Sequence, residues 1–185
     1  ITDFFLSMYK DSFLIEIHKN DKEVFLQKLN IYKLRSEVEF TILKNCNVFL
    51  IFSNSQNLFS NISYDQILFF DDPRFKSYLK RLYFFDKKNY EILKKNNIKE
   101  ISSNEYDEIR FRNGIPDFQV DATKNKSLLM EMRFEDLNGI SWDKGCYMGQ
   151  EITARMKYRN LMKRKIFNIK INFVTHLESS IKVDD

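Results

Sequence analysis

The chain has 185 residues, of which 43% are hydrophobic and 30% are charged, a mixture that supports a packed core and excludes a disordered chain. Four glycines and two prolines exclude collagen-like and linker-rich sequences, and two cysteines cannot form a disulfide framework or a four-cysteine zinc site. The net charge of +4 permits contact with nucleic acid without requiring it, and no apolar run reaches the roughly 20 residues of a membrane-spanning helix.

Strands are expected throughout the first half of the chain, at residues 4–9, 12–18, 38–43, 48–52, 67–70 and 78–85, the last of which is also compatible with a helix. Turns at Lys10–Asp11 and at residues 44–47 would make two hairpins, and residues 53–66 are expected to form a loop. Between the hairpins, Asn20 is expected to cap a helix, with Glu23 at the capping-box position. The order strand, strand, helix, strand, strand favours an α+β fold with antiparallel pairing.

The second half of the chain is expected to be more helical, with helices at residues 89–97, 103–112 and 150–163 and strands at residues 166–174 and 181–183. Ser102 and Glu105 have capping-box spacing at the start of the middle helix, and Gly114 and Pro116 end it. The strand at residues 166–174 alternates apolar and polar side chains, which indicates that one of its faces is buried.

All four glycines lie within a short stretch of the second half, and Cys146 sits between two of them, Gly145 and Gly149. In a chain so poor in glycine, this clustering indicates backbone that needs a positive φ or a close approach. Cys146 follows Lys144 and precedes a predicted helix, a setting that favours the thiolate form of a redox-active or nucleophilic cysteine. The alternative from spacing alone is a small, buried, hydrophobic cysteine in a tight turn.

Residues 144–151 read Lys-Gly-Cys-Tyr-Met-Gly-Gln-Glu and are followed by Ala154 and Arg155. This segment resembles the K-G-C-[FY]-x-G-Q-E-x-x-[AS]-R signature of the YgfZ family, folate-binding proteins related to the aminomethyltransferase (T-protein) of the glycine cleavage system. Further likeness covers most of the chain, at residues 2–6, 31–36, 112–116, 129–140 and 158–164. Leu129 stands where the family usually has a proline.

The resemblance implies a GcvT/YgfZ-like folate-binding fold. It would consist of an α+β region with mostly antiparallel sheets around a central cavity, at residues 1–163, and the start of a C-terminal β-barrel, at residues 164–185. Parts of this fold would precede Ile1 and follow Asp185, so that the chain would be a fragment. The implied function is that of a tetrahydrofolate-binding accessory factor for iron–sulfur cluster assembly or repair, with iron–sulfur client or assembly proteins as partners.

The resemblance also implies a set of site residues. Cys146 would be the reactive, catalytic residue, with Lys144 beside it. The folate would contact Tyr147, Gly149, Gln150, Glu151, Arg155, Arg112, Asp3 and Glu131. Structural alternatives stand beside these roles, because Glu151 and Arg155 have the spacing of a helical ion pair and Gln150 could fill the first turn of a helix.

Two other functions stay open. An aminomethyl transferase needs a positioned carboxylate, and Asp3 and Glu131 are the candidates. T-proteins have an Asp pair where this chain has only Asp3, and they have an acidic residue near the position of Asn113. Both differences argue against T-protein catalysis. A tRNA-modification helper would bind RNA through the basic residues 157–165.

No metal site is expected, since His18 and His176 lack the spacing of ligands. The Lys-, Asn- and Ile-rich composition favours a bacterial cytoplasm, with a mitochondrial matrix as the alternative.

Overall fold

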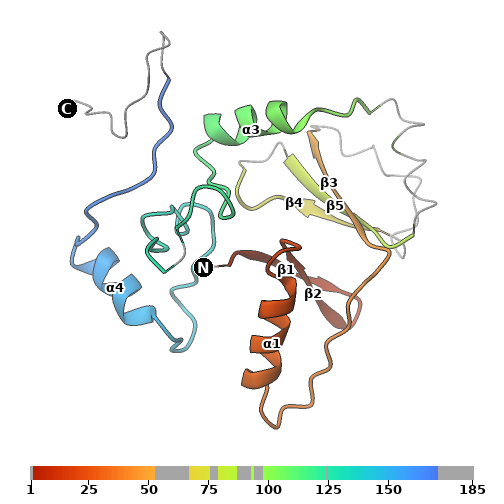
Figure 1. Ribbon diagram of the computed structural model, residues 1–185, viewed down its shortest axis with the longest axis horizontal. Coiled ribbons are helices and arrows are strands. Elements are labelled where there is room, and N and C mark those ends of the chain that lie inside the picture. Colours follow the sequence, from red (N-terminus) through yellow and green to blue (C-terminus); the bar gives the residue numbers. More distant parts are fainter. Residues whose placement is uncertain are drawn as a thin grey trace.

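The structure is a computed structural model that describes residues 2–52, 67–75, 79–86, 93, 98–123 and 125–170. The described strands are β1 (Phe4–Tyr9), β2 (Ser12–Ile17), β3 (Asn47–Phe52), β4 (Ile67–Asp71) and β5 (Leu79–Phe84), and the described helices are α1 (Lys22–Tyr32), α3 (Ser103–Arg112) and α4 (Gln150–Tyr158) (Figure 1). The strands form two antiparallel sheets, so the predicted α+β class is confirmed.

The first hairpin, β1–β2, has the predicted turn, in which Lys10 takes a left-handed conformation. Helix α1 follows and packs against the hairpin through the rings of Phe4 and Phe25, whose centroids are 5.2 Å apart. The prediction that Asn20 caps this helix is wrong, because the N-cap is Asp21 and it makes no side-chain capping bond. The Asp21 carboxylate instead accepts a hydrogen bond from Gln119 at 2.7 Å, which joins α1 to a distant loop.

The second sheet has the order β3–β5–β4, and both pairings are antiparallel. The strands predicted at residues 48–52, 67–70 and 78–85 are confirmed as β3, β4 and β5. The predicted hairpin between residues 38–43 and 48–52 is wrong, since residues 38–43 are not a strand and β3 pairs with β5. Pairing with β5 buries more apolar surface, because Leu79, Leu82 and Phe84 of this central strand are fully buried.

The core consists of two clusters of buried side chains around this sheet. One joins Ile51, Ile67, Leu82, Phe84 and Leu93. The other joins Phe75, Leu79, Ile115 and Leu137, with Ile109 of α3 against it. The capping box of α3 is confirmed in full, since the Ser102 hydroxyl and the Glu105 carboxylate each accept a hydrogen bond from the other residue's backbone N–H.

The last described part, residues 113–170, is mostly irregular and carries α4. Helix α4 ends at Tyr158 rather than near residue 163, because Asn160 takes a left-handed conformation just after its end. Residues 166–170 are not a strand, which contradicts the described part of the strand predicted at 166–174. The loop predicted at 53–66, the strand at 181–183 and most of the helix at 89–97 lie outside the described residues, and the predicted boundary at residue 163 stays a prediction.

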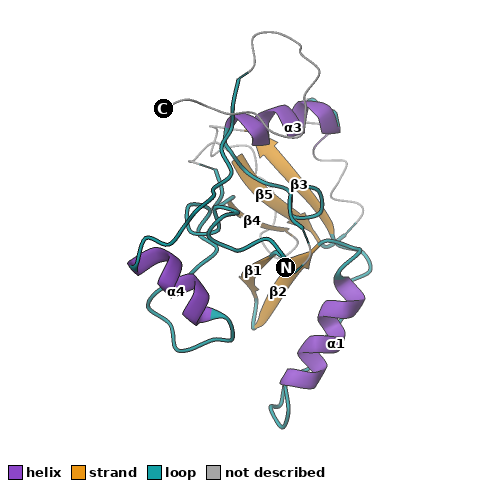
Figure 2. Ribbon diagram, turned by 60° about the vertical axis from the view of Figure 1, so that its left-hand side comes forward, coloured by secondary structure: helices purple, strands orange, loops and turns teal. Residues whose placement is uncertain are grey.

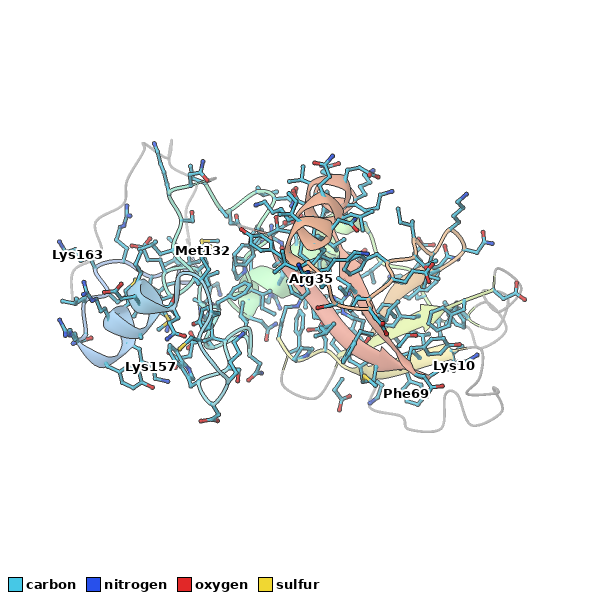
Figure 3. All side chains as sticks on the ribbon, turned by 90° about the horizontal axis from the view of Figure 1, so that it is seen from below. Lys10, Arg35, Phe69, Met132, Lys157 and Lys163 are labelled. Carbon is cyan, nitrogen blue, oxygen red and sulfur yellow. The ribbon has the colours of Figure 1, made fainter. Side chains whose placement is uncertain are left out.

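Helix α4 lies apart from both sheets in two views of the molecule (Figures 1 and 2). Figure 3 shows the same separation, with Lys157 and Lys163 at one end of the molecule and Lys10 and Phe69 toward the other. None of the helices in the described part of the chain is long and apolar enough to cross a membrane.

Candidate functional site

Cys146 lies in the turn that leads into α4, and its thiol is exposed and free. The helix begins at Gln150, with Gly149 as its N-cap in a left-handed conformation at φ +90°. A residue with a side chain is strained by about 1–2 kcal/mol in this conformation, so the turn requires glycine at this position. The expectation of special backbone beside Cys146 is thus confirmed at Gly149, whereas Gly145 has no positive φ.

The side chain of Gln150 holds this turn together. Its Oε1 accepts a hydrogen bond from the backbone N–H of Tyr147 at 3.0 Å, and its Nε2 donates to the sulfur of Cys146 at 3.4 Å. The backbone N–H of Gln150 also donates to the carbonyl of Tyr147 at 3.2 Å. One glutamine therefore ties the cysteine and the following tyrosine to the first residue of α4.

The ammonium group of Lys144 lies over the ring of Tyr147, with its Nζ 4.7 Å from the ring centroid. This is the geometry of a cation–π contact, which contributes about 0.5–1 kcal/mol at an exposed site. The structure therefore places Lys144, Cys146, Tyr147 and Gln150 in one turn and gives the lysine a contact with the aromatic ring. Their predicted roles in catalysis and folate binding stay predictions.

Helix α4 is anchored through the face that points away from solvent. Met156 is buried, and the Lys157 ammonium lies 4.1 Å from the centroid of the Trp142 ring while it pairs with Glu135. These contacts fix the helix to the irregular segment that precedes it. The Cys146 turn is consequently held in place at its C-terminal side while its thiol faces solvent.

The remaining candidates of the second half of the chain are engaged in ion pairs. Glu151 and Arg155 pair at 2.6 Å across one exposed turn of α4, which confirms the structural alternative for these two residues. Arg112 pairs with an exposed glutamate one turn earlier in α3. Glu131 is largely buried and pairs with Arg164 at 3.3 Å. The contacts that the structure gives these four side chains are with each other or with further charged residues, and not with the Cys146 turn.

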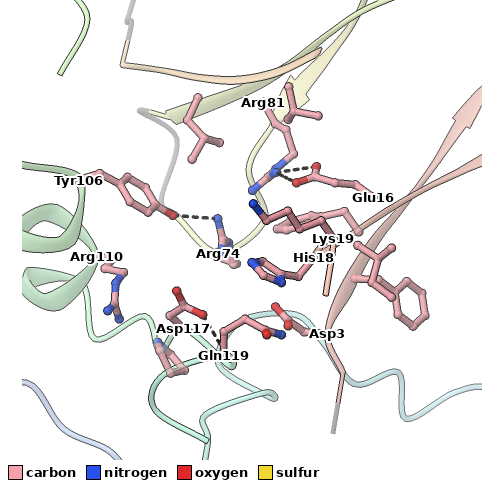
Figure 4. A pocket seen from close by; sticks show the side chains of 16 residues that line it. Asp3, Glu16, His18, Lys19, Arg74, Arg81, Tyr106, Arg110, Asp117 and Gln119 are labelled. Carbon is pink, nitrogen blue, oxygen red and sulfur yellow. Dashed lines mark hydrogen bonds and ion pairs between the residues drawn. The ribbon is translucent and has the colours of Figure 1, made fainter. Parts of the chain in front are cut away.

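A cavity of about 460 Å³ opens between the β1–β2 hairpin, β3, β5, α3 and the loop that follows α3 (Figure 4). The polar side chains that line it include Asp3, Glu16, Arg74, Tyr106, Asp117 and Gln119. Its volume falls within the range of about 300–1,000 Å³ that is usual for small-molecule sites. Of the predicted folate-binding residues, Asp3 alone lines this cavity.

Two arginines at the cavity are held by carboxylates, of which Asp72 is buried and Glu16 is half-buried. Arg81 donates to both oxygens of Glu16, at 2.5 and 2.6 Å, and to Asp72 at 3.0 Å. Arg74 makes a bidentate pair with the same Asp72, at 2.9 and 3.0 Å. The Phe5 ring lies 3.6 Å from the guanidinium carbon of Arg81. The cluster joins the two sheets, since Glu16 belongs to β2 and Arg81 to β5.

Burial raises the pKa of the Asp3 carboxyl, and the charge of Arg74 offsets only part of this effect. The opposite holds for Asp72, where burial alone would raise the pKa but the hydrogen bonds and charges of Arg74 and Arg81 lower it overall. The Asp3 carboxyl therefore keeps its proton to a higher pH than an ordinary aspartate, whereas the Asp72 carboxyl loses its proton at a lower pH.

Sequence reasoning missed the arginine–carboxylate cluster of Glu16, Asp72, Arg74 and Arg81. One signal was present, because the adjacent cations Lys80 and Arg81 stand in an otherwise apolar strand and their side chains point to opposite faces of the sheet. A charged residue inside a buried strand needs a partner of opposite charge. The identity of that partner depends on contacts between residues far apart in the sequence, which no local pattern shows.

No protein-family model matches the chain. The chain does resemble curated proteins that are named as iron–sulfur cluster assembly factors. The chain is 28% identical over 185 residues to the iron–sulfur cluster assembly factor IBA57 homolog, mitochondrial, of Dictyostelium discoideum, an alignment that covers 95% of this chain and 45% of that protein. It is 28% identical over 166 residues to the homolog of the same name from Neurospora crassa, which covers 85% of this chain and 37% of that protein.

A shorter match, 34% identical over 67 residues, is found with the mouse mitochondrial factor IBA57, and it covers 36% of this chain and 19% of that protein. The chain thus spans less than half the length of these relatives. Their names refine the resemblance seen in the sequence, because they are IBA57 proteins rather than proteins named YgfZ.

Proposed function

We propose that the protein is an accessory factor in iron–sulfur cluster assembly and that it acts through Cys146. The observation that carries this proposal is the exposed, free thiol of Cys146, held in a shaped turn at the start of α4. The similarity to assembly factors over 95% of the chain supports it. Since these relatives are named as mitochondrial proteins, we also propose the mitochondrial matrix, rather than a bacterial cytoplasm, as its location.

In this proposal the cluster itself is held by partner proteins. Iron–sulfur clusters take about four protein ligands, mostly cysteine thiolates, and this chain has two cysteines. Within the described residues, no group of three or more His, Cys, Asp and Glu side chains could hold a metal ion. The partners are therefore client enzymes or assembly proteins that carry the cluster.

The test is rescue of cells that lack their own relative. The protein is expressed in Dictyostelium discoideum depleted of the IBA57 homolog, and the activities of mitochondrial iron–sulfur enzymes are measured. We expect recovery of these activities compared with cells that carry an empty vector. Activities that stay at the depleted level, with the protein present and folded in the mitochondria, would contradict the assembly role.

We further propose that a reduced folate, tetrahydrofolate or a derivative, binds in the cavity at Asp3. The cavity has the size of a small-molecule site, and the Asp3 carboxylate can accept hydrogen bonds from the amino and ring N–H groups of a pterin. Among the other carboxylates that line the cavity, Glu16 is paired with Arg81 and Asp117 accepts a hydrogen bond from the backbone N–H of Gln119, so we assign the orientation of the ligand to Asp3.

Titration calorimetry with tetrahydrofolate tests the folate proposal. Asp3→Ala should weaken binding by about tenfold or more, because a hydrogen bond to a charged group contributes roughly 1.5–3 kcal/mol. Asp11→Ala, at the exposed turn of the hairpin, is the matched control and should bind like the wild type. Equal affinities of the wild type and Asp3→Ala, or no binding to either, would refute this part of the proposal.

The structure gives less support to RNA binding through residues 157–165. Three of the cations in this stretch are paired with carboxylates, namely Lys157 with Glu135, Arg164 with Glu131, and Lys165 with Asp136. A cation that is already neutralised gains less from a phosphate and releases fewer counterions.

For the one-carbon transferase alternative, Asp3 is still a candidate carboxylate because it lines the cavity. Glu131 does not line the cavity and pairs with Arg164.

A further inference from the structure

The side-chain amide of Gln150 has its orientation fixed by the turn. The backbone N–H of Tyr147 can only donate, so the end of the amide that faces it must be the carbonyl oxygen. The NH₂ end consequently faces the sulfur of Cys146, at 3.4 Å. Because Gln150 is the first residue of α4, its backbone is set by the helix, and the direction of this N–H donor is set with it.

An N–H donor acts differently on the two states of a thiol. The anionic sulfur is the stronger acceptor, so the hydrogen bond stabilises the thiolate more than the neutral thiol. It also lowers the intrinsic reactivity of the thiolate, but by less than it increases the thiolate population. A donor of this kind therefore speeds the reactions of a partly ionised thiol and slows those of a fully ionised one.

We infer that Gln150 is the positioning residue of Cys146, which orients the sulfur and holds its thiolate by donating a hydrogen bond. This inference rests on the proposed function, in which Cys146 is the reactive group. It gives Gln150 a role within the turn in place of the expected folate contact, because each end of its amide already makes a hydrogen bond there.

The charged groups around the turn do not supply the same contact. Lys144 lies over the Tyr147 ring, and Glu151 pairs with Arg155. Asp143 is exposed, three residues before the cysteine. All four charges stay unchanged in the variants below, so these variants report on Gln150 itself.

The test compares Gln150→Met, which loses both hydrogen bonds, with Gln150→Glu, which can still accept from the backbone of Tyr147 but cannot donate to sulfur. Met148→Glu is the matched charge control. Met148 is highly exposed, so the new glutamate adds a negative charge near Cys146 while the side-chain amide of Gln150 is unchanged. The rate of Cys146 alkylation by iodoacetamide is measured by peptide mass spectrometry, with Cys46 as the internal reference. Circular dichroism checks that each variant is folded.

At about pH 7, where a thiol is only partly ionised, we expect both Gln150 variants to react about two- to fivefold more slowly than the wild type. At about pH 10, where most thiols are ionised, they should react equally fast or faster. A purely structural change would slow the reaction by the same factor at both pH values, and this result would overturn the inference. Unchanged rates would also overturn it.

A pure charge effect has its own signature. If Gln150→Met reacts like the wild type while Gln150→Glu and Met148→Glu are slowed alike, the donor role is refuted. These rates do not depend on cluster assembly. If the Gln150 variants do not change the alkylation rates as expected but the rescue still requires Cys146, only the inference about Gln150 is overturned. If Cys146→Ala rescues the cells fully, only the proposed function is overturned.

Discussion

Among single residues, the fully buried Asp72 carboxylate pairs with both Arg74 and Arg81 and so neutralises charge at the cavity. Asp72→Asn should lower the free energy of unfolding by about 3–5 kcal/mol, because it leaves the largely buried guanidinium of Arg74 without its counter-charge and leaves Arg81 with Glu16 alone. Chemical denaturation measures this loss. Asp71→Asn is the matched control: its exposed pair with Lys80 should contribute less than about 1 kcal/mol. Equal losses in the two variants would contradict this account of the cluster.

Acid should reduce the difference between wild type and Asp72→Asn. The pKa of Asp72 is lower in the folded protein than its ordinary value of 3.8, so its contribution to stability is present above pH 3.8 and is lost as the pH falls through the folded-state pKa. Chemical denaturation of both proteins at a series of acidic pH values measures this convergence.

Asp3 should have the opposite effect on how stability depends on pH. Its pKa is raised in the folded protein by burial, so the folded state holds the proton more tightly and stability falls as the pH rises from 3.8 through the folded-state pKa. Asp3→Asn should therefore be more stable than the wild type at pH 7 and equally stable below about pH 3. A variant that is less stable at pH 7 would refute this. A carboxylate that lowers stability in the free protein is typical of a binding site.

At the scale of elements, the two glycines beside Cys146 make different demands on the turn. Gly149→Ala should cost about 1–2 kcal/mol of stability, because alanine is strained at φ +90° although there is open space for its side chain. Gly145→Ala is the matched control, with equally open space and no positive φ, and it should be nearly neutral. Thermal unfolding of both variants makes the comparison, and a Gly145→Ala loss as large as that of Gly149→Ala would contradict the role of backbone conformation.

Elements with local signals could be predicted from the sequence. The β1–β2 hairpin and the capping box of α3 depend on residues that are neighbours along the chain, and both were found. The pairing of β3 with β5 could not be predicted, because it joins residues more than 25 positions apart and is decided by the apolar area that the sheet buries. The nearer apolar run, residues 38–43, is the partner that local pattern predicts for β3.

The candidate site likewise has parts that the local sequence predicts and parts that it does not. The Cys146 turn was predicted because glycines, cysteine and helix lie within a few residues. The sulfur contact of Gln150 was not, since a side chain's orientation depends on which backbone group it meets. The cluster of Glu16, Asp72 and Arg81 was missed because its members come from three separate segments.

At the scale of the whole molecule, the exposed thiol and the cavity are two separate features. The lining of the cavity includes no residue of the Cys146 turn or of α4, and α4 lies apart from the sheets that surround the cavity (Figure 1). Folate binding and the thiol chemistry should therefore be separable. Cys146→Ala should bind tetrahydrofolate with the affinity of the wild type, which titration calorimetry measures. A tenfold loss of affinity would show that the two features form one site.

If iron–sulfur cluster assembly passes through Cys146, substitution of each of the two cysteines in the rescued cells should give different results. Cys46 is the matched control, since it is partly buried and its pKa is raised by that burial and by the charge of Glu16. The measured quantity is the activity of mitochondrial iron–sulfur enzymes at equal protein levels. We predict that Cys46→Ala restores this activity as the wild type does, and that Cys146→Ala leaves it at the level of the depleted cells. Full restoration by Cys146→Ala would contradict the account.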